Sequence, residues 1–345
     1  TGHRVLRHTQ RRRVLLMTSA AARSSGESGA AQGSKREPLV SVITPAWNAA
    51  QYIQPTMDSL LKQSYSNWEW LIVDDGSTDN TREIIARQSD SRIRLIQNKH
   101  TGLPAAGRNV GLANAKGDFV AFLDSDDLWL PEKIEQQIAL FEKEPDVGLV
   151  FSPYAVWNDG ETSPHRILPD DIAHLPNPGN YFALLCLKNR IGNSTVVVRR
   201  SLLLEHGNLD EDPAVRGSED YELWLRLSRF TRFAFVPVPL IWYRVHANSV
   251  SSNETRNCRT SMRVIEKILA RYPEDGQRPS SRCLKANWQY YLGRAQLLDG
   301  LDDKGRRALA NSLLLWPFNS RAWLYLLIGL TFPGSVRTLR RRFGI

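Results

Sequence analysis

The chain has 345 residues, of which 42% are hydrophobic and 23% charged, and its formal net charge is +9. This length fits one large domain with a smaller appendage. The three cysteines are odd in number and have no paired spacing, so the sequence predicts neither a disulfide framework nor a cysteine zinc site. A reducing compartment is the simplest inference.

The positive charge is concentrated at the two ends of the chain. Residues 1–37 carry eight basic and two acidic residues, and residues 337–345 (RTLRRRFGI) carry four arginines and no acid. The body between them has a charge of −1, which argues against a nucleic-acid-binding groove. The basic ends fit either an anionic membrane surface or simple solvation, and both remain open. Residues 323–333 (WLYLLIGLTFP) are apolar but too short to span a bilayer, so peripheral contact is the expected form of membrane binding.

Strand-like and helix-like segments alternate after a Gly- and Ser-rich linker that ends near residue 38. Runs rich in β-branched residues predict strands at 40–45, 68–73, 91–98, 118–124 and 147–152. Helical spacing of apolar residues predicts helices at 51–64, 77–88, 103–117 and 131–143. This alternation predicts a mainly parallel sheet with helices on both faces, which binds ligands at the carboxyl ends of its strands.

The pattern weakens after residue 152. Residues 158–193 predict a long loop with one short helix near YFALLCL, followed by a strand at 194–200 and a helix at 219–230. Beyond residue 250 the pattern is helical, with a helical hairpin that turns near Pro317. The predicted organisation is a basic tail over 1–37, an α/β domain over 38–255 and a helical extension over 256–345.

Three aspartates follow the predicted strand at 118–124, in the sequence FVAFLDSDDLWLP. Residues two apart in extended backbone point the same way, so Asp124 and Asp126 can present carboxylates to one ion. Oxygen ligands suit Mg²⁺ or Mn²⁺, and a cation would offset the repulsion among the acids. The alternative is a cap on the helix that begins near Pro131, which we favour for Asp127 but not for the other two.

Other polar side chains are expected at the same edge of the sheet. Asp75 can accept a hydrogen bond from a base or a ribose, or stabilise a turn. Arg108 can contact a base or a phosphate, or form an ion pair with Asp75. Glu219 and Asp220 either cap a helix or supply a general base. His246 is either a ligand or phosphate contact or a structural histidine.

Six segments together resemble one known family. In chain order they are VSVITPAWNAAQYI, LIVDDGSTDNT, GLPAAGRNVGLANAKGDFVAFLDSDDLWLPEKIE, VVVRRSLL, GSEDYELWLRL and YRVHANSVS, which span roughly residues 38–252. They resemble the family-2 glycosyltransferases, which are inverting enzymes that use nucleotide-diphosphate sugars. The resemblance implies a GT-A fold, a Rossmann-like α/β architecture with a mainly parallel sheet flanked by helices, here followed by an α-helical C-terminal extension.

The resemblance also implies which residues bind the donor. Thr44 and Asp75 would line the nucleoside site, and Pro45 would shape the loop between them. Arg108 would lie near the base and the phosphates, and Asp124 would contact the diphosphate.

The same resemblance implies the metal site and the catalytic base. Asp124 and Asp126 would hold Mn²⁺ or Mg²⁺ on the diphosphate, and His246 would approach the same ion. Asp220 would deprotonate the acceptor hydroxyl. A divalent ion would stabilise the charge on the departing nucleoside diphosphate, which is a physical reason for three adjacent aspartates.

The implied partners are a nucleotide-diphosphate sugar, with a UDP-sugar first, and a glycan or lipid-linked acceptor of the bacterial envelope. No nucleic acid is expected. The expected location is cytoplasmic, with peripheral contact at the inner face of the plasma membrane. Three positions differ from residues that are common in the family: Trp47, Gly107 and Leu209. These differences bear on how the donor fits its site and not on whether the protein is active.

Two alternatives to a glycosyltransferase predict different sequence features. A catalytically silent nucleotide-sugar-binding subunit of an envelope assembly complex would have a broken aspartate pair or a lost base, and both are intact. A nucleotidyltransferase would have a Gly-rich phosphate loop after the first strand, which TPAWNAAQ lacks.

Overall fold

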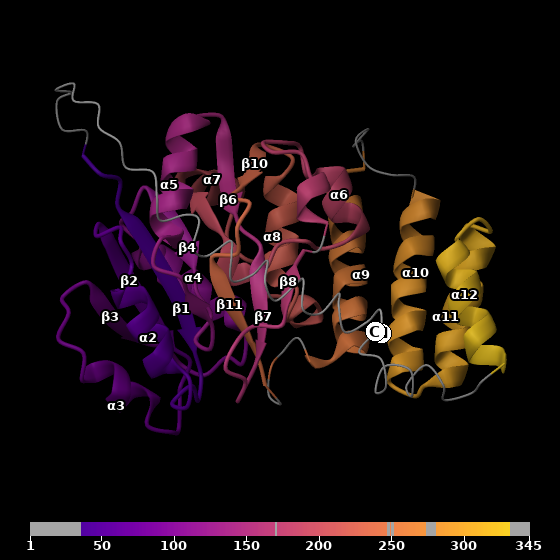
Figure 1. The fold of residues 1–345 in the computed structure, drawn as a ribbon, viewed down its shortest axis with the longest axis horizontal. Helices are drawn as coiled ribbons and strands as arrows, with labels where there is room; N and C mark the ends of the chain where they lie inside the picture. The colour runs from indigo at the N-terminus through magenta and orange to yellow at the C-terminus, as the bar shows by residue number, and fades with distance from the viewer. Residues whose placement is uncertain (1–35, 170, 247–248, 250–251, 274–280, 332–345) are drawn as a thin grey trace, which may run out of the picture.

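The computed structural model describes residues 36–169, 171–246, 249, 252–273 and 281–331 (Figure 1). Nearly all of the predicted basic N-terminal tail and the arginine-rich C-terminal segment lie outside the described residues. The structure therefore bears on the α/β domain and on most of the helical extension.

Seven strands form a large central sheet. Its order is β10-β6-β9-β4-β1-β2-β3, and β9 alone runs antiparallel to its neighbours. The strands are β1 (Val40–Ala46), β2 (Trp68–Asp74), β3 (Ile93–Gln97), β4 (Phe119–Phe122), β6 (Val147–Phe151), β9 (Val197–Arg199) and β10 (Arg232–Phe235). The predicted mainly parallel sheet is confirmed.

Helices cover both faces of this sheet, and each face has its own apolar core. Successive side chains of a strand point to opposite faces, so Val42 lies in one core and Ile43 in the other. The Val42 core also takes side chains from α2 (Ile53–Leu61), α3 (Thr81–Ala86) and α5 (Lys133–Lys143). The Ile43 core takes side chains from α4 (Pro104–Asn114), α6 (Phe182–Leu187), α7 (Arg200–His206) and α8 (Glu219–Leu227).

A second, four-stranded sheet was not predicted. Its order is β5-β11-β7-β8, and its strands are β5 (Leu128–Trp129), β7 (Tyr154–Asn158), β8 (Arg166–Leu168) and β11 (Ile241–Val245). β8 lies inside the segment expected to be a loop, although α6 confirms the helix expected there. The strands are short and only partly buried, so their sequences lack the apolar alternation that identifies a half-buried strand.

Short 3-10 helices connect several of these elements. They are η1 (Ile172–His174), η2 (Asn193–Thr195) and η3 (Pro213–Val215). η2 leads directly into β9 and lies against the carboxyl end of β4, next to the predicted aspartate cluster.

The C-terminal region is helical, as expected. It consists of α9 (Glu254–Arg271), α10 (Ser281–Leu298), α11 (Asp302–Leu315) and α12 (Ser320–Thr331). Val264 and Ile268 of α9, with Leu284 and Trp288 of α10, belong to the same core as Ile43 of the sheet. α11 and α12 lie at the far end of the molecule from β3 (Figure 1). Among the described helices none is long and apolar enough to cross a membrane.

Candidate active site

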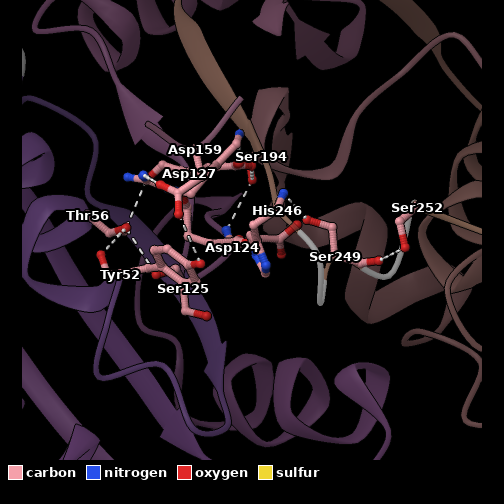
Figure 2. A network of polar contacts seen from close by, with 12 residues as sticks. Tyr52, Thr56, Asp124, Ser125, Asp127, Asp159, Ser194, His246, Ser249 and Ser252 are labelled. Atoms are coloured by element: carbon pink, nitrogen blue, oxygen red, sulfur yellow. Dashed lines mark hydrogen bonds and ion pairs between the residues drawn. The ribbon is translucent and has the colours of Figure 1, made fainter. Parts of the chain in front are cut away.

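The aspartate cluster lies in a tight connection between the two sheets. Asp124 follows β4, Asp127 precedes β5, and the backbone N–H of Asp127 donates to the carbonyl of Asp124 at 3.2 Å. Thr56 of α2 holds this connection, because its hydroxyl lies 3.1 Å from the carbonyl of Ser125 and 2.9 Å from that of Asp127 (Figure 2). The acids are therefore fixed by the join of two sheets and not by a flexible loop.

Asp124 is bound on two sides. Its Oδ1 accepts from Nη2 of Arg108 at 2.7 Å and from Nδ2 of Asn193 at 2.8 Å. Its backbone N–H donates to the hydroxyl of Ser194 at 3.0 Å. Elements α4, β4 and η2 thus converge on this single carboxylate.

Arg108 connects the aspartate cluster to the start of α8. Its Nη1 donates to Oε1 of Glu219 at 2.7 Å, while its Nη2 binds Asp124. Burial lowers the pKa of Arg108, but the two carboxylates more than offset that and hold its pKa above the ordinary value. The alternative ion pair between Arg108 and Asp75 is wrong, because the guanidinium binds Asp124 and Glu219.

Asp126 faces His246. Its Oδ2 lies 2.9 Å from Nε2 of His246. The ring of His246 stacks on that of Tyr52, with the ring centroids 4.5 Å apart (Figure 2). Burial and the charge of Asp124 raise the pKa of Asp126, and the contact with His246 opposes that rise. The two residues expected to share an ion are therefore already in contact.

Asp127 has a structural environment. Its Oδ2 accepts from the hydroxyl of Ser194 at 2.6 Å, and its Oδ1 accepts from the backbone N–H of Arg244 at 3.0 Å. Burial, with Asp126 and Asp124 nearby, raises the pKa of Asp127 well above its usual value. The predicted helix cap is wrong: α5 begins at Lys133, and Asp127 instead ties β11 to η2.

Asp220 and Glu219 begin α8 but have different surroundings. Glu219 is held by Arg108 and by the backbone N–H of Gly217. The carboxylate of Asp220 accepts from the backbone N–H of Tyr221 at 2.7 Å. Burial and the charge of Glu219 raise the pKa of Asp220 to about 7, although Arg108 lowers it. A carboxylate with such a pKa is suited to take a proton near neutral pH.

Asp75 lies at the end of β2 beside an aromatic pair. Its carboxylate accepts from the backbone N–H groups of Thr101 and Gly102, both at 2.9 Å. His100 contacts the carbonyl of Asp75 at 2.7 Å and stacks on the exposed ring of Trp47. The pair forms an exposed aromatic surface next to Asp75, of a kind on which a nucleobase can stack.

Thr44 and Pro45 lie beneath this surface. The hydroxyl of Thr44 is fully buried and accepts from the indole Nε1 of Trp70 at 2.8 Å. A Cβ built on Gly107 would lie 3.1 Å from Cβ of Pro45, so β1 and α4 approach closely here. In this arrangement Thr44 and Pro45 shape the edge of the sheet, and the side chain of Thr44 does not reach its surface.

The donor set at Asp124 and Asp126 fits a divalent ion held only partly by protein. Both carboxylates are about one quarter exposed, at 28% and 26%, and the imidazole of His246 adjoins them. Among the described residues, no group of three or more His, Cys, Asp or Glu side chains is placed so that it could hold a metal ion. Such an open arrangement leaves coordination positions for phosphate oxygens and water.

Comparison with known proteins assigns the chain to a family. Residues 41–207 match the family model for glycosyl transferase family 2. The chain is 36% identical over 242 residues to the UDP-Glc:alpha-D-GlcNAc-diphosphoundecaprenol beta-1,3-glucosyltransferase WfgD of Escherichia coli, covering 68% of this chain and 89% of that protein. It is also 36% identical over 237 residues to the putative teichuronic acid biosynthesis glycosyltransferase TuaG of Bacillus subtilis (strain 168), covering 67% and 89%. The chain belongs to glycosyltransferase family 2.

Solved structures show the fold of this family-2 glycosyltransferase. Staphylococcus aureus TarS 1–349 superposes with a TM-score of 0.57 at 18% identity, covering 88% of this chain and 91% of that one. The mannosyltransferase PcManGT from Pyrobaculum calidifontis, in complex with GDP-Man and Mn²⁺, gives 0.57 at 17% identity, covering 89% and 88%. The expected GT-A-like α/β fold, with its helical C-terminal region, is confirmed.

The fold gathers the predicted residues into two groups at the carboxyl edge of the sheet. One contains Asp75; the other joins Asp124 to Asp126 and, through Arg108, to the start of α8.

Several residues of the site were missed from the sequence. Arg244 donates from Nε to the carbonyl of Asp126 at 2.9 Å and from Nη1 to Asp159 at 2.9 Å, and its guanidinium lies 4.1 Å from the ring centroid of Trp157. The segment YRVHANSVS contained Arg244, and its position two residues before His246 on a strand was the available signal. Asn193 lies in the segment expected to be a loop, and nothing in the sequence distinguishes it there from the neighbouring polar residues.

Proposed function

We propose that this protein is a metal-dependent, inverting glycosyltransferase that moves a sugar from a nucleotide-diphosphate donor to a hydroxyl acceptor in bacterial envelope polysaccharide synthesis. The observation that carries the proposal is the bridge made by Arg108. It links Asp124 of the acid pair to Glu219, the residue before the proposed base Asp220, through one buried guanidinium.

Asp220 acts as the general base. Its carboxylate takes the proton of the acceptor hydroxyl while the hydroxyl oxygen attacks the anomeric carbon of the sugar. The bond to the nucleoside diphosphate breaks in the same displacement, which inverts the anomeric centre. The pKa of about 7 makes proton uptake by Asp220 more favourable than for an ordinary aspartate.

The donor lies along the carboxyl edge of the sheet. Asp75 accepts from the nucleoside, Thr44 and Pro45 shape the edge below it, and the ring pair of Trp47 and His100 supports the base. A UDP-sugar is the favoured donor, because the name of WfgD specifies UDP-Glc and TarS 1–349 has been solved with UDP and with UDP-GlcNAc.

The ion would be Mn²⁺ or Mg²⁺, and Asp124, Asp126 and His246 are the residues that would hold it. It would supply positive charge to the departing diphosphate. The complex of PcManGT with GDP-Man and Mn²⁺ supports this assignment. Arg108 fixes the orientation of the Asp124 carboxylate by a hydrogen-bonded ion pair at 2.7 Å.

The acceptor is a glycan or a lipid-linked precursor. WfgD is named for GlcNAc-diphosphoundecaprenol and TuaG for teichuronic acid biosynthesis, and both names support a place in envelope polysaccharide synthesis. A silent binding subunit is disfavoured, because Asp220 has an environment that raises its pKa and Glu219, not Asp220, holds Arg108.

Donor binding can be tested without knowing the acceptor. We expect UDP with Mn²⁺ to raise the melting temperature, and excess chelator to remove most of that increase, because ligands that bind only the folded state stabilise it. An equal shift in chelator would contradict the metal assignment. GDP serves as the comparison for base preference.

The base can be tested by Asp220→Asn. Transfer from UDP-glucose or UDP-GlcNAc to a diphosphate-lipid acceptor should fall by at least about 10³-fold, while the UDP-induced melting shift stays. Asp58→Asn, on an exposed acid of α2, is the matched control and should leave transfer unchanged. Near-normal transfer by Asp220→Asn would refute the role.

A further inference from the structure

The outer face of α12 is an exposed apolar surface with no role in the proposed chemistry. Trp323, Leu324, Leu327 and Leu330 are 48%, 56%, 54% and 56% exposed. Trp323, Leu327 and Leu330 follow the spacing i, i+4, i+7, so they lie along one side of the helix. We call these four residues the α12 face.

The inner side of the same helix is packed, so the exposure is not a sign of a loose helix. Ala322 is fully buried. A Cβ built on Gly329 would lie 3.3 Å from Leu297 of α10, and the carbonyl of Gly329 accepts from Nη1 of Arg306 at 3.3 Å. The indole Nε1 of Trp323 donates to the carbonyl of Pro317 at 2.9 Å, which fixes its ring at the start of the face.

Exposed apolar side chains also lie at the end of α11 and in the turn before α12. Leu314, Trp316 and Phe318 are 74%, 43% and 84% exposed, and the rings of Trp316 and Phe318 lie 6.1 Å apart. The α11–α12 hairpin therefore presents seven large apolar side chains to solvent at the end of the molecule farthest from β3 (Figure 1). Patches of this kind mark contact surfaces.

The charge of the surrounding sequence indicates what covers this surface. Residues 304–345 contain eight basic residues and no acid, a charge of +8, whereas residues 38–303 have a net charge of −5. Four of the eight are arginines in the segment that follows α12. Apolar and tryptophan side chains combined with clustered basic residues fit an anionic lipid surface.

A second copy of the chain is the competing occupant, and the charge disfavours it. A two-fold interface places the same patch opposite itself, so two positively charged α11–α12 hairpins would meet. Like charges brought together in this way repel, whereas anionic headgroups would attract them.

We infer that the α12 face docks the protein on an anionic membrane, with the helix lying in the plane of the interface. The helix has 12 residues, which is too short to span a bilayer but sufficient to lie along it. This inference goes beyond the proposed chemistry and does not depend on it.

The test is co-sedimentation of the full chain with phosphatidylcholine vesicles that contain or lack phosphatidylglycerol. We expect binding only with the anionic lipid, and weaker binding at high salt because charges are screened. The triple variant L324Q/L327Q/L330Q should lose at least about tenfold in binding, because the apolar side chains no longer enter the interface.

The matched control is Leu204→Gln in α7, since Leu204 is 62% exposed but lies on the catalytic part. It should bind like the parent protein, and the far-ultraviolet circular dichroism of both variants should match the parent. Equal binding by the triple variant, or no binding of the parent to anionic vesicles, would overturn the inference. So would a triple variant that dissociates a dimer, seen by light scattering, without losing lipid binding. The vesicle assay contains no sugar donor. A protein that binds vesicles but transfers no sugar would therefore contradict the proposed function and leave the membrane inference intact.

Discussion

At the carboxyl edge of the large sheet the charged side chains are buried, whereas in the α11–α12 hairpin the large apolar side chains are exposed. Arg108 is buried between Asp124 and Glu219, while Leu314 and Phe318 are largely in solvent. Both arrangements cost stability in an isolated chain, since charges prefer water and apolar groups avoid it.

The two regions differ in what offsets the free-energy cost of their side chains. The charges at the edge are offset within the chain by hydrogen bonds across the fold, and a bound cation and diphosphate would complete the balance. The large apolar side chains of the hairpin remain exposed within the described chain, and the inferred membrane surface would cover them.

The largest effect should come from removing one acid of the edge. Asp126→Ala should reduce sugar transfer by at least about 10³-fold, because the ion loses a carboxylate and His246 loses its partner. The melting temperature without ligand should change little, since Asp126 is partly exposed. Asp303→Ala, which removes an exposed acid of α11, should leave the transfer rate unchanged. Comparable losses in both variants would erase the contrast.

The next effect is on stability. Arg108→Ala should cost about 3–5 kcal/mol of unfolding free energy, because Asp124 and Glu219 would remain without their cation. Arg263→Ala breaks an exposed ion pair with Glu266 in α9 and should cost less than about 0.5 kcal/mol. Urea denaturation measures both. If Arg108→Ala is as stable as the parent, the edge is not held together by this ion pair.

The pH dependence should centre on Asp220. The transfer rate should rise with pH and level off above about 7, because the base must be ionised. Stability should run the other way. A carboxyl whose folded pKa lies above its unfolded value of 3.8 is favoured when protonated, so folding loses free energy as pH rises from about 4 to about 7.

Asp220→Asn isolates this cost. The variant should be more stable than the parent at pH 8 by about 2 kcal/mol, a figure reduced for the partial exposure of the side chain. At pH 4 most of that advantage should vanish. Thermal unfolding across pH measures the difference, and a constant advantage at every pH would show that Asp220 is not the titrating group.

The smallest effect concerns packing in the helical region. A Cβ on Gly293 of α10 would lie 2.7 Å from Leu309 and 2.9 Å from the carbonyl of Gly305, so Gly293→Ala must push α10 and α11 apart. Overpacking is partly offset by the helix preference of alanine, and the net loss should be about 1 kcal/mol. The Cβ of Gly107→Ala in α4 would lie 3.1 Å from Pro45 and 3.9 Å from Val73, so this substitution should be near neutral. The reverse order would mean that α10 and α11 are less closely packed than the structure shows.

The alternation of strands and helices was readable from residues 38–152, because apolar spacing reports local backbone and burial together. The strands of the small sheet were not readable. They are short and half-buried, and β11 pairs with β7 from far along the sequence. The exposed leucines of α12 were visible only as an apolar run, because a sequence does not say which side of a helix finds a neighbour.

The identity of the acids, their two-residue spacing and the strand that precedes them can be read from the sequence. Their hydrogen-bond partners are set only by the folded chain. Arg108 and Glu219 are 111 residues apart, and Asp126 and His246 are 120 apart, yet each pair is within hydrogen-bond distance. A buried charge is satisfied by whichever group the fold brings near it, and periodicity along the chain carries no information about that partner.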